Sequence, residues 1–298
     1  MAEARKQHVP HKRPVDKPWC AEHKRNQQIE GRELPIGGAS DTFQWLCCTG
    51  PSGPLLADSS LPTTVMFGQI PSTQFDLRFS VLGIPVRVHP IFWITSVFLA
   101  WVPEQLDRVF VRVLCVFVSI LVHELGHAVV TRSFGWYPEI VLYILGGYAT
   151  TTRHTAWKDI AVSAAGPAAG FLLFFAIWFP VRFRLFGPLP QSELILDALG
   201  FSLFINLAWN VMNLMPVLPL DGGHISRSFC EWISPRRGRQ TSLLISLVSA
   251  GAITLWSVRA MNRHEGVLGL EPMFLALMFG YLGFQSYQQY QAARRGYY

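Results

Sequence analysis

Long apolar stretches dominate the chain after residue 65 and restrict what it can fold into. A helix that crosses the hydrocarbon core of a bilayer needs about 20 residues, with some tolerance for tilt. Six stretches approach or reach this length: 88–103, 109–134, 159–181, 198–219, 241–258 and 271–286. Only 15% of the residues are charged, against about 25% in soluble domains. The sequence therefore predicts an all-α polytopic membrane protein with about six transmembrane helices.

The first 65 residues differ from the rest and are predicted to form a disordered polar tail. They are rich in Lys, Glu, Gln, Pro and Gly and show no sustained apolar periodicity. The segment that begins at Met66 resembles a natural start, so we expect residues 1–65 to be a mis-assigned extension. On this interpretation the membrane domain covers residues 66–298.

The distribution of basic residues predicts an orientation in the membrane. If the tail side is cytoplasmic, that side carries eleven Lys and Arg residues after residue 65 and the opposite side carries six. Cytoplasmic loops are enriched in these residues, so we expect both termini to face the cytoplasm of an inner or plasma membrane. The same rule accounts for the net charge of +6 without a nucleic-acid partner, and we expect none.

Two histidines and a glutamate interrupt the second apolar stretch, in the segment SILVHELGHAVV at 119–130. His123 and His127 are four residues apart, which places both imidazoles on one face of a helix. Such groups are costly at membrane depth unless they have partners, and two imidazoles on one face can bind one metal ion. Glu124 is placed as the general base in H-E-x-x-H metalloprotease helices. The pattern therefore predicts a catalytic zinc site.

A catalytic zinc has about three protein ligands, so a third ligand is expected elsewhere. The fourth apolar stretch contains NLMPVLPLDGG at 213–223, where Pro216 and Pro219 interrupt the helix. Unwound backbone within a membrane persists only where it is buried in protein or lines a wet cavity. Asp221 is the predicted third ligand and His224 is its rival. The alternative for Asp221 is a cap of the next segment or a solvated turn.

The two segments HELGH and NLMPVLPLDGG together resemble the site-2 protease family of intramembrane zinc metalloproteases. Shorter matches occur at GIPVRVHP (83–90), LGGYA (145–149), AAGPAAG (164–170) and NLAWNVMNLMP (206–216). The resemblance implies a core of three helices formed by the second to fourth spans. It also implies one zinc ion held by His123, His127 and Asp221, with Glu124 as general base. The AAGPAAG segment is expected to give close helix packing.

The resemblance further implies cleavage of transmembrane helices of other membrane proteins, on a site that opens towards the cytoplasm. In bacteria the substrates of the family are often anti-sigma factors or signal-peptide remnants. Asn213 matches a substrate-contacting position of the family, which predicts a donor to the oxyanion; its alternative is an amide that satisfies freed carbonyls. Asn206 and Asn210 are expected to join helices. The segment YILGGYATT (143–151) is predicted to be a short strand or re-entrant loop that pairs with the extended substrate, or else a packed connector.

Two other classes of protein compete with the protease. A zinc-binding transporter or channel would explain broken helices and buried polar residues, but no inverted repeat is apparent and H-E-x-x-H would be unexplained. A catalytically inactive relative that acts as a membrane scaffold would not need the intact Glu124. Replacing Glu124 by Gln separates these classes.

Overall fold

The computed structural model describes residues 72–144, 146–149, 155–185, 187–188, 190–263 and 270–295. These residues belong to one compact unit, Thr63–Tyr298. The predicted tail, residues 1–65, and the predicted start at Met66 lie outside the described residues.

Each of the six apolar stretches contains a helix, but not every helix can cross a membrane. The helices are α2 (Pro90–Ala100), α3 (Leu106–Ser133), α4 (Ala156–Phe183), α5 (Glu193–Asn213), α7 (Gly238–Arg263) and α8 (Pro272–Arg294). Within the described residues, four of them (α3, α4, α5 and α7) are long and apolar enough to span a bilayer. α2 has only 11 residues, and the second half of α8 is rich in Gln and Tyr. By length and composition, four of the about six expected spans therefore qualify among the described residues.

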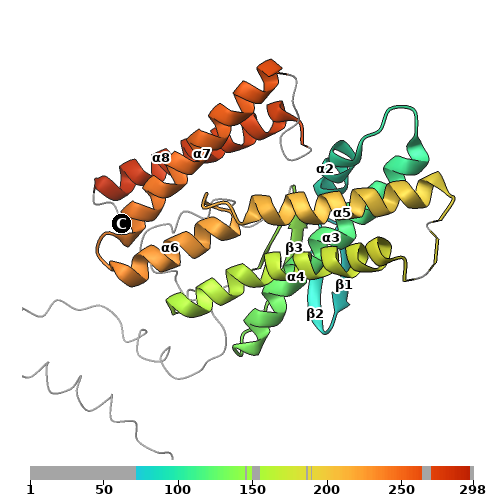
Figure 1. Ribbon diagram of the computed structural model, residues 1–298. Coiled ribbons are helices and arrows are strands. Elements are labelled where there is room, and N and C mark those ends of the chain that lie inside the picture. The colour runs from blue at the N-terminus through green and yellow to red at the C-terminus, as the bar shows by residue number, and fades with distance from the viewer. Residues whose placement is uncertain are drawn as a thin grey trace, which may run out of the picture. The chain divides into compact units, whose positions relative to one another are not determined.

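Helices α3, α4 and α5 pack against one another in pairs (Figure 1). The side of α3 that contributes to the core carries Val113, Val116 and Ile120, spaced by three or four residues as a helical face requires. α5 contributes Ile205 and Trp209 to the same core. The three-helix core expected from the sequence is therefore present in the structure.

A four-stranded sheet lies beside this core, and it is larger than expected. Its strands are β1 (Leu77–Val81), β2 (Ile84–Val88), β3 (Ile140–Tyr143) and β4 (Gly146–Ala149), in the order β1-β2-β3-β4. The β2–β3 pair is parallel and the two outer pairs are antiparallel. β4 falls in the segment predicted to form a strand or re-entrant loop (143–151), whereas β3 shares only Tyr143 with it. The β1–β2 hairpin was not anticipated.

The hairpin can be explained by its residues. Leu82 and Gly83 both have positive φ, 53° and 73°, as a tight two-residue turn between twisted strands requires. In β2 the apolar Ile84, Val86 and Val88 are buried at every second position. This period of two is the pattern of a strand with one face in the core. Five residues were too few for this alternation to be distinguished from a loop before the first span.

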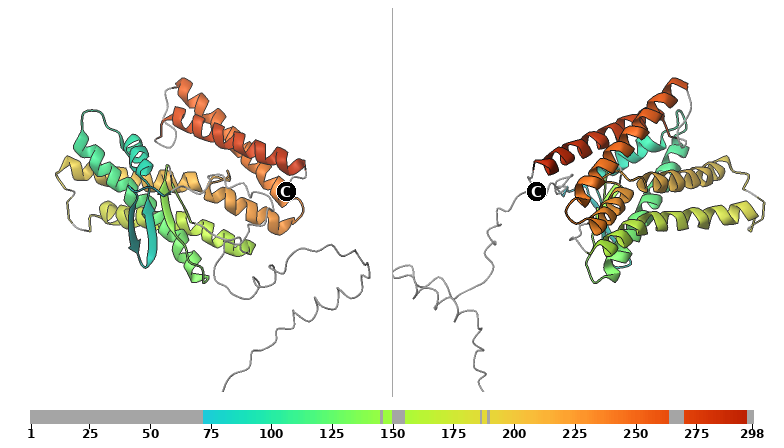
Figure 2. Two further views of the ribbon diagram at one scale, coloured as in Figure 1. Left: turned by 180° about the vertical axis from the view of Figure 1, so that it is seen from behind. Right: turned by 60° about the vertical axis from the view of Figure 1, so that its left-hand side comes forward.

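The fourth apolar stretch is broken as predicted. α5 ends at Asn213 and α6 (Asp221–Ile233) begins at Asp221. The seven residues between the two helices include Pro216 and Pro219. After α6, helices α7 and α8 run side by side as a hairpin (Figure 2). The break matters because α6 starts at one of the predicted metal ligands.

Candidate metal centre

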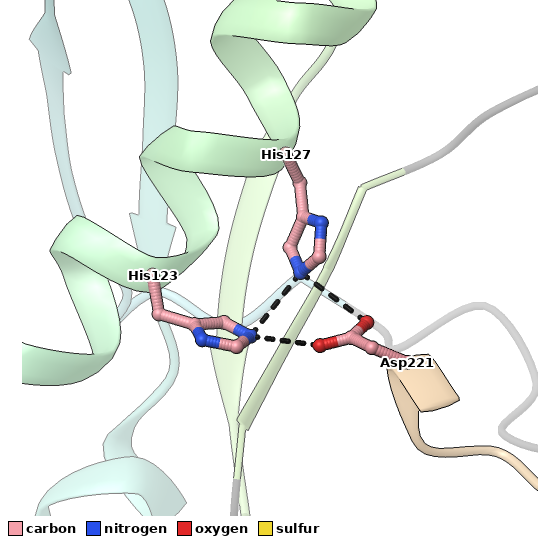
Figure 3. A group of neighbouring side chains, drawn as sticks. All are labelled: His123, His127 and Asp221. Atoms are coloured by element: carbon pink, nitrogen blue, oxygen red, sulfur yellow. Dashed lines mark hydrogen bonds and ion pairs between the residues drawn. The ribbon is translucent and has the colours of Figure 1, made fainter. Parts of the chain in front are cut away.

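The side chains of His123, His127 and Asp221 converge on one point (Figure 3). The two histidines come from α3 and the aspartate is the first residue of α6. The Nε2 atoms of the two imidazoles are 3.2 Å apart. The carboxylate of Asp221 lies 3.1 Å from Nε2 of His123 and 3.3 Å from Nε2 of His127. Three ligand atoms, all within 4.8 Å of one another, are thus brought together from segments about a hundred residues apart.

The second nitrogen of each imidazole is held by an acceptor. Nδ1 of His123 lies 2.9 Å from the side-chain oxygen of Asn210, and Nδ1 of His127 lies 2.7 Å from the carbonyl oxygen of Val162. With a metal in the centre, each Nδ1 donates its proton to this acceptor, and Nε2 is then free to bind the metal. In metal sites, the ring of a ligating histidine is commonly oriented by an acceptor that binds its other nitrogen. Two such nitrogens and a carboxylate form a ligand set that suits zinc.

The glycines of AAGPAAG make room for these groups. A Cβ atom built on Gly166 would overlap the imidazole of His127, and one built on Gly170 would overlap the side-chain amide of Asn210. On α3, a Cβ on Gly126 would collide with the carbonyl oxygen of Ala165. The expected close packing is therefore found. This packing lets α4 lie directly against the predicted ligand His127 and against Asn210, which contacts His123.

The other predicted site residues are placed as follows. Glu124 is buried on α3 next to His123, with 5% of its surface exposed. His224, the rival ligand, is exposed and is not part of the group formed by the described residues. The side-chain amide of Asn213 donates to the carbonyl oxygen of Trp209, 3.0 Å away on the same helix. This bond satisfies a carbonyl, as the structural alternative requires, but it does not bridge two helices. The catalytic roles of Glu124 and Asn213 stay predictions.

Asn210 has a more specific place than the sequence suggested. Its amide donates to the carbonyl oxygen of Asn206, which fixes the side-chain oxygen towards His123. Asn206 in turn donates to Ser119, 2.9 Å away on α3. We expected helix-joining amides, which Asn206 provides, but the contact of Asn210 with a predicted ligand was missed. The available signal was the spacing of four between the two asparagines, which matches the spacing of the two histidines.

Comparison with known proteins agrees with this geometry. The model of peptidase family M50 matches residues 111–187 and 180–256. The first match contains the two histidines and the second contains Asp221. The chain belongs to peptidase family M50. The resemblance to the site-2 protease family predicted from the sequence is thereby confirmed.

Three relatives of this M50 protein match about half of the chain, and two of them are named as zinc metalloproteases. The zinc metalloprotease MJ0392 of Methanocaldococcus jannaschii is 29% identical over 153 residues, which cover 50% of this chain and 44% of the relative. A Synechocystis protein that also bears the name of a zinc metalloprotease is 31% identical over 59% of this chain and 45% of its own length. Stage IV sporulation protein FB of Bacillus subtilis is 29% identical over 48% of this chain and 47% of its own. The chain thus spans about half the length of the curated relatives it matches.

A solved structure shares the fold of this M50 protein. The site-2 protease from Methanocaldococcus jannaschii aligns with a TM-score of 0.51 over 72% of this chain and 95% of that chain. The two sequences are 24% identical, so the likeness is one of fold. The four apolar helices and the match to peptidase family M50 identify the chain as a membrane protein.

Proposed function

We propose that this M50 protein is an intramembrane zinc metalloprotease that hydrolyses peptide bonds in transmembrane segments of other membrane proteins. One observation carries the proposal: His123, His127 and Asp221 converge between a membrane-spanning helix and a broken one, with Glu124 buried beside them. When bound by these three residues, zinc would act as a Lewis acid that polarises the scissile carbonyl and lowers the pKa of a water molecule. Proton transfer, stabilisation of the oxyanion and binding of the substrate are assigned to residues of the protein.

Glu124 is the group proposed to move the proton. In an H-E-x-x-H helix the glutamate accepts a proton from the attacking water and delivers it to the departing amine. Its burial on α3 keeps bulk water away from this transfer. Asn213 is the proposed donor to the oxygen that becomes negatively charged. An amide group has two N–H donors, and the bond to Trp209 uses one of them.

The sheet offers a place for an unwound substrate. Helical hydrogen bonds shield the carbonyls of a transmembrane substrate, so it has to be extended before cleavage. β4 is an edge strand of the described sheet, and it lies against α3, the helix that carries both histidines. We propose that the substrate adds to this edge as a further strand. The alternative, a packed connector, predicts no effect of substrate on the exchange of β4 amides.

The orientation and the kind of substrate complete the proposal. His127 lies six residues before the end of α3 at Ser133, which corresponds to about 9 Å along a helix. The site is therefore close to one membrane surface, and the bias of basic residues favours the cytoplasmic surface. The proposed partners are transmembrane proteins, among which anti-sigma factors and signal-peptide remnants suit cleavage from this side.

The test uses purified protein in liposomes with a model transmembrane substrate, and compares the wild type with Glu124→Gln. The variant keeps all three zinc ligands, so we expect unchanged zinc content and a loss of cleavage of about 10²- to 10⁴-fold. Equal cleavage by both proteins would refute the hydrolytic mechanism. A wild type that binds zinc but cleaves nothing would favour the scaffold. Zinc uptake into sealed vesicles would favour the transporter.

A further inference from the structure

One backbone donor of the segment that leads to Asp221 is satisfied by a side chain of another helix and not by a nearby backbone carbonyl. Residues 214–220 include Pro216 and Pro219, which have no N–H group. Four of the other N–H groups donate to backbone carbonyls two to four residues earlier in the chain: Leu214 to Asn210, Met215 to Met212, Val217 to Met215 and Leu220 to Val217. The N–H group of Leu218 donates instead to a side chain of another helix.

The acceptor is Ser246 on α7. Its hydroxyl oxygen lies 2.9 Å from the nitrogen of Leu218 and 2.8 Å from the hydroxyl oxygen of Ser286 on α8. Both serines are fully buried, and Leu218 is 4% exposed. Buried polar groups are normally paired, and here three of them pair across three different segments. The hydroxyls of α7 and α8 thus hold the broken segment at its centre.

The position of Leu218 is linked directly to that of Asp221. The two residues after Asp221 are Gly222 and Gly223, and both pack on the backbone of the broken segment. A Cβ on Gly222 would collide with the carbonyl oxygen of Leu214, and one on Gly223 would collide with the backbone of Val217 and Leu218. With no side chain between them, the first turn of α6 follows any displacement of the segment.

We propose that Ser246, supported by Ser286, is a positioning residue that holds Asp221 in place through the Leu218 N–H group. This inference rests on the proposed function only in naming the role of Asp221 as a zinc ligand. It gives α7 and α8 a part in the metal centre, although neither helix contributes a ligand to the group formed by the described residues.

The test compares Ser246→Ala with Ser257→Ala in the full chain. Both serines are on α7 and fully buried, and eleven residues apart they lie about 20° apart around the helix. The hydroxyl of Ser257, however, has no hydrogen-bond partner among the described residues. Two quantities are measured on each protein: the rate of zinc transfer to a chelator, and amide hydrogen exchange in residues 214–224.

We expect zinc to leave the Ser246→Ala variant about three to ten times faster than the wild type, which is less than the 10- to 100-fold effect typical of groups that contact a ligand directly. Exchange in residues 214–224 should rise in the same variant. Ser257→Ala should match the wild type in both measurements, and Ser246→Thr, which restores a hydroxyl, should recover slow zinc release. Equal values for Ser246→Ala and Ser257→Ala would overturn the proposal.

Two further results keep the test decisive. If Ser246→Ala does not fold, Ser286→Ala takes its place, because it leaves the Leu218 bond intact and removes only the support behind it; a wild-type zinc-release rate in that variant would overturn the proposal. If the wild type holds no zinc, the proposed function fails, and exchange in residues 214–224 alone then decides whether Ser246 holds the segment.

Discussion

The side-chain oxygen of Asn210 on α5 lies 2.9 Å from Nδ1 of His123 on α3. This contact favours the tautomer that is protonated at Nδ1, which leaves Nε2 available to a metal. Both residues are almost fully buried, so water does not compete for the bond. The packing of α5 against α3 is therefore part of the chemistry of the centre as well as of the core.

Replacing Asn210 by Ala should weaken the metal centre. The variant leaves Nδ1 of His123 without its acceptor, so the imidazole loses both its orientation and its preferred tautomer. We expect zinc affinity and cleavage to fall about 10- to 100-fold, measured by chelator competition and with a model substrate. Ser96→Ala is the control, since that buried hydroxyl has no partner among the described residues. Equal zinc affinity in the two variants would show that the contact with His123 has no function.

Replacing Gly166 by Ala should disturb His127 without adding any polar group. The new methyl group would occupy the space of the imidazole, so either the ring or α4 has to move. We expect the affinity for zinc to fall by at least about tenfold, comparable to the loss of a residue that hydrogen-bonds to a metal ligand. Gly200→Ala on α5 is the matched control, because a Cβ there meets nothing within 4 Å. Zinc titration of both purified variants checks the prediction, and normal binding by Gly166→Ala would contradict it.

An ion pair at the far end of the core should affect stability and leave the metal centre intact. Arg112 on α3 forms two hydrogen bonds to Asp197 on α5, one of them 2.8 Å long. Because Arg112 precedes His123 by eleven residues, the pair is about 16 Å from the centre along α3. Asp197→Ala leaves the guanidinium without its acceptor, and we expect a loss of about 1–3 kcal/mol in unfolding free energy.

Thermal unfolding in detergent measures this loss, and zinc titration of the same sample provides the comparison. The double variant Arg112→Met with Asp197→Ala should recover part of the stability, since no charge is then left unpaired. A large fall in zinc affinity in the Asp197→Ala variant would show that the two ends of the core are coupled, contrary to this prediction.

The sheet should contribute a pH dependence of its own through Asp76, which precedes β1. Burial raises the pKa of this carboxyl group, but hydrogen bonds from Thr73 and the guanidinium of Arg87 outweigh that effect and lower the pKa from 3.8 to about 2. A pKa that is lower in the folded state stabilises the fold above pH 3.8, and this contribution disappears as the pH falls towards 2.

Asp76→Asn removes the titrating group, so the difference in melting temperature between wild type and variant should shrink as the pH falls from 5 to 2.5. The measurement is made on zinc-free protein, so that loss of zinc at low pH does not contribute, and titration of the other groups is common to wild type and variant. A difference that stays constant over this interval would contradict the low pKa of Asp76.

The positions of the six apolar helices and the three side chains that converge could be predicted from the sequence alone, whereas α6 (Asp221–Ile233) was not anticipated. Apolar length is a local property, and it located all six helical stretches, although length and composition leave four that can span a membrane. The spacing of His123 and His127 and the prolines before Asp221 are also local, so they indicated the metal site directly. The β1–β2 hairpin was missed because five-residue strands carry too little periodicity.

The tertiary structure alone decided how the ligands are held. Asn210 reaches His123 across 87 positions of the sequence, Gly166 makes room for a ring on another helix, and Ser246 reaches Leu218 across 28 positions. No pattern within a single segment encodes these contacts, because each depends on the distance and rotation at which two helices pack. The sequence by itself identified the three candidate ligands, and the packing of the helices determined how their side chains converge.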